Sequence, residues 1–274
     1  MEKSVEVLRS YALDYASRLE SSTIQKEPAI WSYLLYLLPK LTFPLMALTL
    51  TEPQCHYIQS PALRALLPKL HLNRNMARSI INGPLIYDGM NLPHLYTIQG
   101  CDQLKFLLGH LQAQDKTCKL ILIRHGYLQL LVGITKNFLN EPYQTFSYCI
   151  CPSWLTSVWQ FMSKFHLSIT MRDAWLPSSL EPGDVNLMEY FVSRSFFAKQ
   201  LASLNRCRVY LQVLSFSDIV SADGKTIISS VLDGHKLVDR RSSLLWPSQA
   251  TPPRSGWRLW AEALQPLHYR NLLK

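Results

Sequence analysis

The chain of 274 residues is 48% hydrophobic and 17% charged, with a formal net charge of +9 and ten glycines. The apolar content favours a packed core, and the positive charge favours anionic partners, nucleic acid before an acidic membrane surface. So few glycines argue against a protein built on glycine-rich phosphate-binding loops. The low charged fraction indicates that another domain or a partner covers part of the surface.

The six cysteines form no CxxC pair and no regular framework, which is typical of reduced thiols and predicts an intracellular protein, cytoplasmic or nuclear. The N-terminal letters MEKS do not lead into an apolar signal region, so we expect no secretory peptide. The longest apolar run, residues 31–50, is interrupted by Pro39, Lys40 and Pro44. We therefore expect no membrane span.

The first half of the chain reads as a series of helices. Apolar residues recur every three or four positions over 4–21, which predicts a helix with Ser4 as its N-cap. Glu27-Pro28 opens a second helix, which Pro39 and Pro44 kink or end. Further helices are expected from Thr51, capped with Gln54, to about Leu67; from an Asn75 cap to Gly83; and over 95–114 and 117–132, with Asp88-Gly89 as a turn and Gly133 as a stop.

The second half predicts further helices with short extended pieces. Residues 134–152 are loop-like with a short strand, and 168–175 alternate weakly like a strand. Helices are expected over 153–167, 183–194, 196–213 and 256–264, and residues 216–232 predict a small hairpin with Asp223-Gly224 as its turn. The predicted fold class is mainly α: a multi-helix, bundle-like array with a small β-hairpin near the C-terminus.

A series of short motifs runs through most of the chain. Residues 31–100 carry W-x-Y, P-K-L-x-F-P-L and L-P-K-L-x-L-N-R-N-x-x-R-x-I-x-x-G-P, and later come L-x-x-L-N-x-C-R-V-Y-L-Q-V-L-S-F-S-D-I-x-x-x-D-G and W-P-S-Q-x-x-P-P. In this order they resemble the region after the catalytic palm in reverse transcriptases of non-LTR retrotransposons, namely the thumb and C-terminal extension. Asp88 departs from the pattern, because the family usually has Gly-Gly there.

The resemblance implies two regions: residues 1–133 as a helical thumb-like region, and 134–274 as a helical C-terminal extension with the hairpin and a basic tail. It also implies RNA or an RNA/DNA hybrid as partner, together with a palm and fingers domain of the same polyprotein. In that family the thumb packs on the primer–template duplex, and the extension helps hold template RNA.

Residues for catalysis are not evident. A polymerase needs paired carboxylates to hold Mg²⁺, and the chain contains no Asp-Asp pair. It also lacks a GxSxG elbow, a P-loop and an HExxH motif. Cys149, Cys151 and His166 lack the paired spacing of a structural zinc site, and buried thiols are the plainer interpretation. We therefore predict no enzyme activity, no catalytic residue, no metal site and no cofactor.

The basic residues are the better candidates for function. The segment after residue 63 has Arg64, Lys69, Arg74 and Arg78, with no carboxylate between Glu52 and Asp88. If the loop gathers these cations, each contacts a phosphate, and Asn73 and Asn75 add neutral hydrogen bonds. The alternative is a set of ordinary exposed cations. The predicted nucleic-acid-binding residues are Arg64, Lys69, Asn73, Arg74, Arg78, Arg240, Arg241 and Arg258.

The last three of these belong to a basic tail that also contains Trp246, Trp257 and Trp260. Tryptophan beside arginine can stack on single-stranded bases, although such residues more often anchor a tail to its own core. Arg206 and Arg208 point to different faces of one helix, so at most one faces a ligand.

Two other readings of the whole chain stay open at this point. One is a helical scaffold for protein–protein interaction, and the other is a decayed element without activity. An enzyme with unrecognised chemistry ranks below both.

Overall fold

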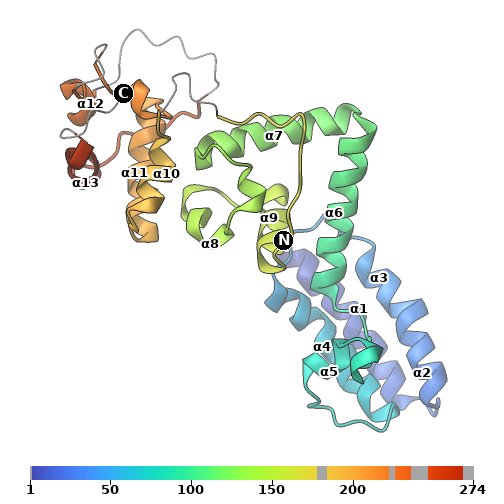
Figure 1. The fold of residues 1–274 in the computed structure, drawn as a ribbon. Helices are drawn as coiled ribbons and strands as arrows, with labels where there is room; N and C mark the ends of the chain where they lie inside the picture. The colour runs from blue at the N-terminus through green and yellow to red at the C-terminus, as the bar shows by residue number, and fades with distance from the viewer. Residues whose placement is uncertain (1, 178–183, 222–225, 236–245, 268–274) are drawn as a thin grey trace. The chain divides into compact units, whose positions relative to one another are not determined.

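A computed structural model describes residues 2–177, 184–221, 226–235 and 246–267 (Figure 1). The fold is mainly helical, as the sequence predicts. It divides into two units: residues 1–113 with 156–158, and residues 114–155 with 159–274. The boundary predicted after residue 133 falls inside the second unit. In the part of the chain that is described, no helix is long and apolar enough to cross a membrane.

The first unit is built on two long helices, α1 (Glu2–Ser21) and α4 (Glu52–Lys69), which pack side by side (Figure 1). The predicted apolar face of α1 is confirmed. The prediction of Ser4 as N-cap is wrong, because the helix begins at Glu2 and Ser4 lies within its first turn. The buried face of α1 consists of Val5, Leu8, Ala12, Tyr15, Ala16 and Leu19.

Prolines shape the next segment, which runs through α2 (Lys26–Ser32), the π-helical turn η1 (Tyr33–Leu37) and α3 (Leu38–Thr42). Pro39 has no N–H to donate, and its ring crowds the carbonyl four residues earlier. The wider π-helical turn directly before it accommodates this defect, so the backbone stays helical. The helix then ends before Pro44, as predicted.

Helix α4 shows how the sequence solves two backbone problems. At its start, the N–H of Thr51 donates to Oε1 of Gln54 at 2.9 Å, which confirms the predicted cap. In its interior, Pro61 leaves the carbonyl of Tyr57 without a helical donor. The guanidinium of Arg9, on α1, donates to this carbonyl and lies 3.6 Å from the centroid of the Tyr57 ring. Arg9 therefore stabilises the packing of α1 on α4.

The short helix α5 (Arg78–Asn82) starts later than the sequence suggested. Its N-cap is Ala77, so the prediction of Asn75 as cap is wrong. The N–H of Asn75 instead donates to Oδ1 of Asn73 at 2.8 Å, which forms a side-chain turn before the helix. The helix ends before Gly83, as predicted.

After the 3₁₀ turn η2 (Leu85–Tyr87), the chain reverses at Asp88, whose φ of 57° is left-handed, as the turn signal predicted. Helix α6 (Leu95–Ala113) then matches its predicted range closely. Its buried Gln99 accepts from the N–H of Leu50 at 3.2 Å and donates to the carbonyl of the same residue at 2.9 Å. This amide pair ties α6 to the chain before α4.

The second unit begins with α7 (Lys116–Val132), close to the predicted range. Asp115 caps it by accepting from the N–H of Cys118 at 2.8 Å. It ends at Gly133, whose φ of 74° is left-handed, so the predicted stop is confirmed.

Residues 134–152 contain no strand, contrary to the prediction. They form short helical turns, η3 (Phe138–Asn140), α8 (Tyr143–Phe146) and η4 (Ser147–Cys149), before the predicted helix α9 (Trp154–Lys164).

The strand predicted over 168–175 is also wrong, because this segment is turn and irregular chain. The side-chain amide of Asn140 explains this locally. It donates to the carbonyl of Ile169 at 3.1 Å and accepts from the N–H of Ile169 at 2.8 Å. A side chain thus takes the backbone groups that a neighbouring strand would pair with.

Helices α10 (Leu187–Ser193) and α11 (Ala198–Leu211) follow as predicted, with shorter ends. Arg208 of α11 is fully buried and reaches the C-terminus of α7. Its Nη2 donates to the carbonyls of Leu130 at 2.7 Å and Leu131 at 2.9 Å. These carbonyls belong to the last helical turn, which has no intrahelical donors of its own, so Arg208 supplies them.

The turn of the predicted hairpin, Asp223-Gly224, lies outside the described residues. On its flanks, the N–H of Ser221 donates to Thr226 at 2.8 Å, and Val220 and Ile227 form one isolated antiparallel bridge. The described residues contain no β-strand. The hairpin therefore stays a prediction. The last elements are α12 (Ser229–Leu232), α13 (Arg254–Leu264), as predicted, and η6 (Gln265–Leu267).

Candidate nucleic-acid interface

The predicted binding residues fall on both units. Five lie in the first unit, between the second half of α4 and the start of α5, and one lies on α13 of the second unit. Arg240 and Arg241 lie outside the described residues. The described members are Arg64 and Lys69 on α4, Asn73 and Arg74 in the connection, Arg78 at the start of α5, and Arg258 on α13.

Arg64 and Arg78 lie within electrostatic reach of each other, and both act on His56. The pKa of Arg78 is lowered, first by burial and then by the positive charge of Arg64. The pKa of His56 is lowered by burial, then by the charges of Arg78 and Arg64, and Glu52 opposes this only in part. His56 and Arg64 are eight residues apart on α4, a spacing that places them on the same side of a helix two turns apart.

The guanidinium of Arg78 has unfilled hydrogen-bonding capacity among the described residues. Its Nη1 is buried and has no hydrogen-bond partner among the described residues. Arg64 is exposed and forms no salt bridge or hydrogen bond with a described residue. Two like charges within electrostatic reach of each other repel, and an anion that binds both removes this repulsion. A phosphate oxygen is the acceptor that a guanidinium binds best in such a place.

A buried phenol lies within electrostatic reach of Arg78 but does not neutralise it. Burial raises the pKa of Tyr33 to about 12, so the phenol is uncharged at neutral pH. Its oxygen accepts from Nε2 of Gln59 at 2.5 Å, and the same amide donates to the carbonyl of Pro93 at 2.6 Å. His56, Arg64 and Arg78 are named here the α4–α5 cluster. The uncharged, hydrogen-bonded Tyr33 lies within electrostatic reach of its Arg78 and does not neutralise it.

Lys69 has a different position from the one that its spacing suggested. Its Nζ donates to the carbonyl of Ser22 at 2.5 Å, so it joins the end of α4 to the residue after α1. This bond holds the ammonium in a half-buried place. Lys69 therefore stabilises the helix pair, whatever further contact it makes.

Asn73 and Arg74 lie in the exposed connection between α4 and α5. The side-chain oxygen of Asn73 is occupied by the N–H of Asn75. The charge of Arg64 lowers the pKa of Arg78. The connection between α4 and α5 therefore returns Arg78 to within electrostatic reach of Arg64.

The described part of the tail serves packing. Arg258 is exposed and forms a salt bridge with Glu262 at 3.0 Å, one turn along α13. Trp260 is fully buried, and the ring of Trp257 lies 5.7 Å from that of Tyr210 in an edge-on arrangement. These two tryptophans pack α13 against its own unit.

Sequence reasoning missed His56, and the signal that could have found it is its eight-residue spacing from Arg64.

Burial shifts the pKa of two ionisable side chains outside the α4–α5 cluster. His125 is fully buried, with Nε2 at 3.0 Å from Oδ1 of Asn137, and burial lowers its pKa. Burial raises the pKa of the Cys149 thiol to about 11, which keeps it protonated at neutral pH. All six cysteines are free, and no three His, Cys, Asp or Glu side chains in the described ranges are arranged to hold a metal ion.

Comparisons of the chain with protein-family models, with curated proteins and with solved structures find no match.

Proposed function

We propose that this chain binds nucleic acid through its phosphate backbone, with Arg64 and Arg78 as the phosphate contacts and His56 at their edge. The observation that carries the proposal is a partly buried guanidinium whose Nη1 has no hydrogen-bond partner among the described residues. It lies within electrostatic reach of a second guanidinium that forms no salt bridge with a described residue. The planar guanidinium donates paired hydrogen bonds that match the oxygens of a phosphate group, so arginine is the usual contact in phosphate sites. The formal net charge of +9 adds a long-range attraction for the same ligand.

The order of the sequence motifs supports a more specific form of this proposal. The chain is then the thumb and C-terminal extension of a non-LTR retrotransposon reverse transcriptase, and its ligand is RNA or an RNA/DNA hybrid. It acts with a palm and fingers domain, because the chain has no Asp-Asp pair to hold the catalytic Mg²⁺. The hairpin over 216–232 belongs to this proposal too. Alone, the chain gives no templated product in a primer-extension assay.

The binding mode follows from the chemistry of the α4–α5 cluster. Contacts to phosphates carry no base information, so affinity varies little with sequence. Each neutralised phosphate releases counterions, so affinity falls steeply with salt.

The test measures the affinity for an RNA/DNA hybrid between 50 and 300 mM salt, for the parent and for R64Q/R78Q. The double change removes two phosphate contacts, so we expect the slope of log K against log salt to fall by about two and the affinity to drop by about tenfold or more. The matched control is R18Q/K26Q, which removes the same charge from exposed positions on α1 and α2. It should keep most of the parent slope.

If both double variants lose affinity equally, binding reflects net charge and not this cluster. If R64Q/R78Q binds like the parent at every salt concentration, the proposed contacts are wrong.

A second candidate function, a helical scaffold for proteins, has one observation in its favour. The side chains of Leu85, Ile86 and Tyr87 on η2 are 68%, 81% and 79% exposed, and they are consecutive. A contiguous exposed apolar group is typical of a protein contact. Light scattering separates the candidates, because a defined oligomer without affinity for the hybrid favours the scaffold.

A further inference from the structure

Helix α7 of the second unit has one buried face and one exposed stripe. Its buried face includes Cys118, His125, Leu128 and Gln129. On the opposite side, exposed positions recur at spacings of three and four residues, so they share one face of the helix. These exposed residues, named here the α7 stripe, are Lys116, Lys119, Leu120, Ile123 and Arg124.

Two large apolar side chains lie in the middle of the α7 stripe, beside a hollow. Leu120 is 67% exposed and Ile123 is 70% exposed, and the hollow has a volume of about 250 Å³. Its walls present almost only apolar surface and consist of Thr117, Leu120, Ile121 and Arg124 on α7 and Ser153, Trp154 and Leu155 around the start of α9. Leu120 therefore joins the stripe to the hollow.

The charges on the α7 stripe are all positive. Lys116, Lys119 and Arg124 make no salt bridge or side-chain hydrogen bond to a described residue. The sequence has no Asp or Glu over residues 116–140, and the carboxylate of the preceding Asp115 caps the helix. The stripe therefore combines an apolar centre with cations that no described carboxylate pairs.

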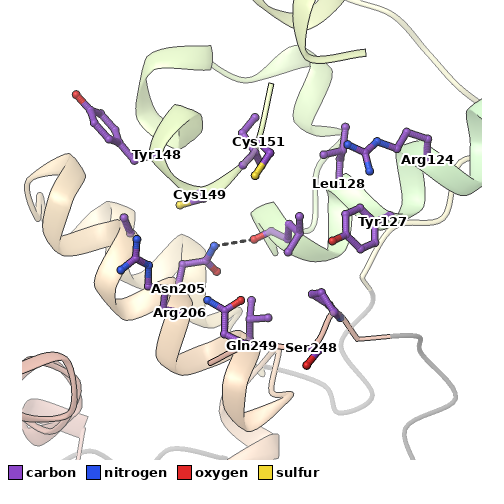
Figure 2. A pocket seen from close by; sticks show the side chains of 15 residues that line it. Arg124, Tyr127, Leu128, Tyr148, Cys149, Cys151, Asn205, Arg206, Ser248 and Gln249 are labelled. Carbon is purple, nitrogen blue, oxygen red and sulfur yellow. Dashed lines mark hydrogen bonds between the residues drawn. The ribbon is translucent and has the colours of Figure 1, made fainter. Parts of the chain in front are cut away.

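Arg124 also lies at a second, larger pocket without meeting a carboxylate there. This pocket has a volume of about 370 Å³, and Figure 2 shows Arg124 and Tyr127 on one of its walls and Arg206 on another. The guanidinium of Arg124 lies 5.1 Å from the ring centroid of Tyr127, one turn further along α7. No described Asp or Glu lines either pocket. The charge of Arg124 is therefore available to a partner from outside the chain.

The walls of the hollow are linked by buried rings. The ring of His125, on α7, lies 4.9 Å from that of Phe138, and Phe138 lies 4.9 Å from Trp159 of α9 in an edge-on arrangement. All three rings are fully buried, and Nε1 of Trp159 donates to the carbonyl of Glu141 at 2.7 Å. Because buried side chains are closely packed, the hollow keeps its shape without a ligand.

The shape and charge of this surface select among anionic partners. A nucleic-acid backbone offers phosphates to the cations but no aliphatic side chain for the hollow. A bilayer takes up apolar side chains that protrude, and a recess is the opposite shape. Small-molecule pockets span about 300–1,000 Å³, so the hollow suits a single inserted side chain better than a whole ligand. An amphipathic helix with acidic flanks supplies both apolar anchors and carboxylates.

We infer that the α7 stripe binds an acidic, amphipathic helix of a partner protein. One bulky apolar side chain of that helix occupies the hollow beside Leu120, and its carboxylates lie along the cations of the stripe. The surface belongs to the second unit, so it does not depend on the proposed role of the α4–α5 cluster.

The test is fluorescence anisotropy of a dilute, fluorescein-labelled peptide, three repeats of Leu-Glu-Glu-Leu-Leu-Glu-Gln, titrated with the full chain. Its leucines share one side of a helix, and glutamates flank them. We expect saturable binding that L120Q and I123Q each weaken by about tenfold, because each removes an apolar contact at the centre of the surface. The matched control is F197Q, which changes a side chain that is 80% exposed beside α11 in the same unit, and it should bind like the parent.

A second arm tests the cations. K116Q/K119Q should weaken binding of the peptide by about threefold to tenfold at low salt and by less at high salt, because salt screens exposed charges. The control R172Q/K199Q removes the same charge from exposed positions of the same unit outside the stripe, and it should bind nearly like the parent. The same peptide with lysine in place of glutamate should not bind.

Three results overturn the inference: no saturable binding of the peptide, equal binding by L120Q, I123Q and the parent, or equal losses in K116Q/K119Q and R172Q/K199Q. The inference is also wrong if the peptide does not bind while K116Q/K119Q abolishes binding to an RNA/DNA hybrid or to vesicles of phosphatidylserine and phosphatidylcholine. That result assigns the stripe to nucleic acid or to a membrane surface.

R64Q/R78Q should bind the peptide like the parent, so this surface and the α4–α5 cluster can fail separately. Circular dichroism in the near ultraviolet checks that each variant is folded. A variant that is not folded is replaced by alanine at the same position, which also removes the contact and favours the helix.

Discussion

The two units use arginine in opposite ways. In the second unit, the guanidinium of Arg208 is fully buried and hydrogen-bonded to three backbone carbonyls and one amide oxygen. In the first unit, Arg78 keeps an unpaired buried Nη1 beside the charge of Arg64. Neither arrangement includes a carboxylate that bonds to the guanidinium within the described residues.

The difference separates an arginine that holds the fold from arginines left for a ligand. Arg208 lies at the C-terminus of α7, where partial negative charge on the carbonyls favours a cation. Its pKa is nevertheless lowered to about 10, because burial penalises the charged form. Among the described residues, Arg64 and Arg78 have no such carbonyl partners, so their charge is available to an external anion.

Arg208→Met should lower the free energy of unfolding by roughly 2–4 kcal/mol, because it leaves the carbonyls of Leu130 and Leu131 buried without donors. Urea denaturation followed by circular dichroism measures the loss. The adjacent exposed change R206Q is the control and should cost less than about 0.5 kcal/mol. A loss from R208M as small as the control would mean that the buried network does not hold the unit together.

Gly133→Ala should destabilise the chain by roughly 1–3 kcal/mol, because residue 133 has a φ of 74° and an added Cβ would overlap with the guanidinium of Arg208. Thermal denaturation measures the shift in Tm. Gly126→Ala on the same helix is the control. Its Cβ would meet one atom at 3.9 Å, and it should leave Tm unchanged or raise it. Equal effects of the two changes would contradict the role given to Gly133.

The double change R64Q/R78Q should leave the free energy of unfolding within about 0.5 kcal/mol of the parent. Neither arginine donates a hydrogen bond to a described residue, and solvent screens most of their repulsion. Urea denaturation with the parent alongside checks this. A large loss of stability would assign both arginines a structural role like that of Arg208.

Arg64→Gln should raise the pKa of His56 toward its ordinary value of about 6.5, because one of the two cations that lower it is removed. The lowered pKa of the folded state means that the unfolded state takes up the proton first as pH falls. The free energy of unfolding therefore declines as pH drops from about 6.5 to the pKa of His56 in the folded state. In R64Q this pH range is narrower. A proton NMR titration of the His56 ring measures it, and R18Q should leave the His56 pKa unchanged.

The sequence was sufficient to predict most helices because their signals are local. The four-residue spacing of Leu8 and Ala12, the cap at Thr51 and the stop at Gly133 are each signals that span only a few residues. The prediction of a strand over 168–175 was wrong for a non-local reason. The side chain of Asn140 forms hydrogen bonds with the N–H and the carbonyl of Ile169. Asn75 is not the cap because α5 begins at Arg78 with Ala77 as its N-cap, and Asn75 lies in the side-chain turn before it.

The candidate site was only partly predictable. Charge density along the chain singled out Arg64 and Arg78, but proximity in sequence also grouped Lys69 with them. The carbonyl that holds Lys69 belongs to Ser22, and a one-dimensional pattern does not reveal so distant a partner. For the same reason, the sequence separated Arg206 from Arg208 by helix face but gave no sign that Arg124 would lie across a pocket from Arg206.

The most direct measurement is an NMR titration of the arginine Nε–Hε signals with an RNA/DNA hybrid, with Arg64 and Arg78 assigned from R64Q and R78Q. The account predicts that these two signals shift together and saturate at the same hybrid concentration, while Arg208 Nε–Hε stays in place. Signals of Arg64 and Arg78 that do not move, while other arginines shift and saturate, would contradict it.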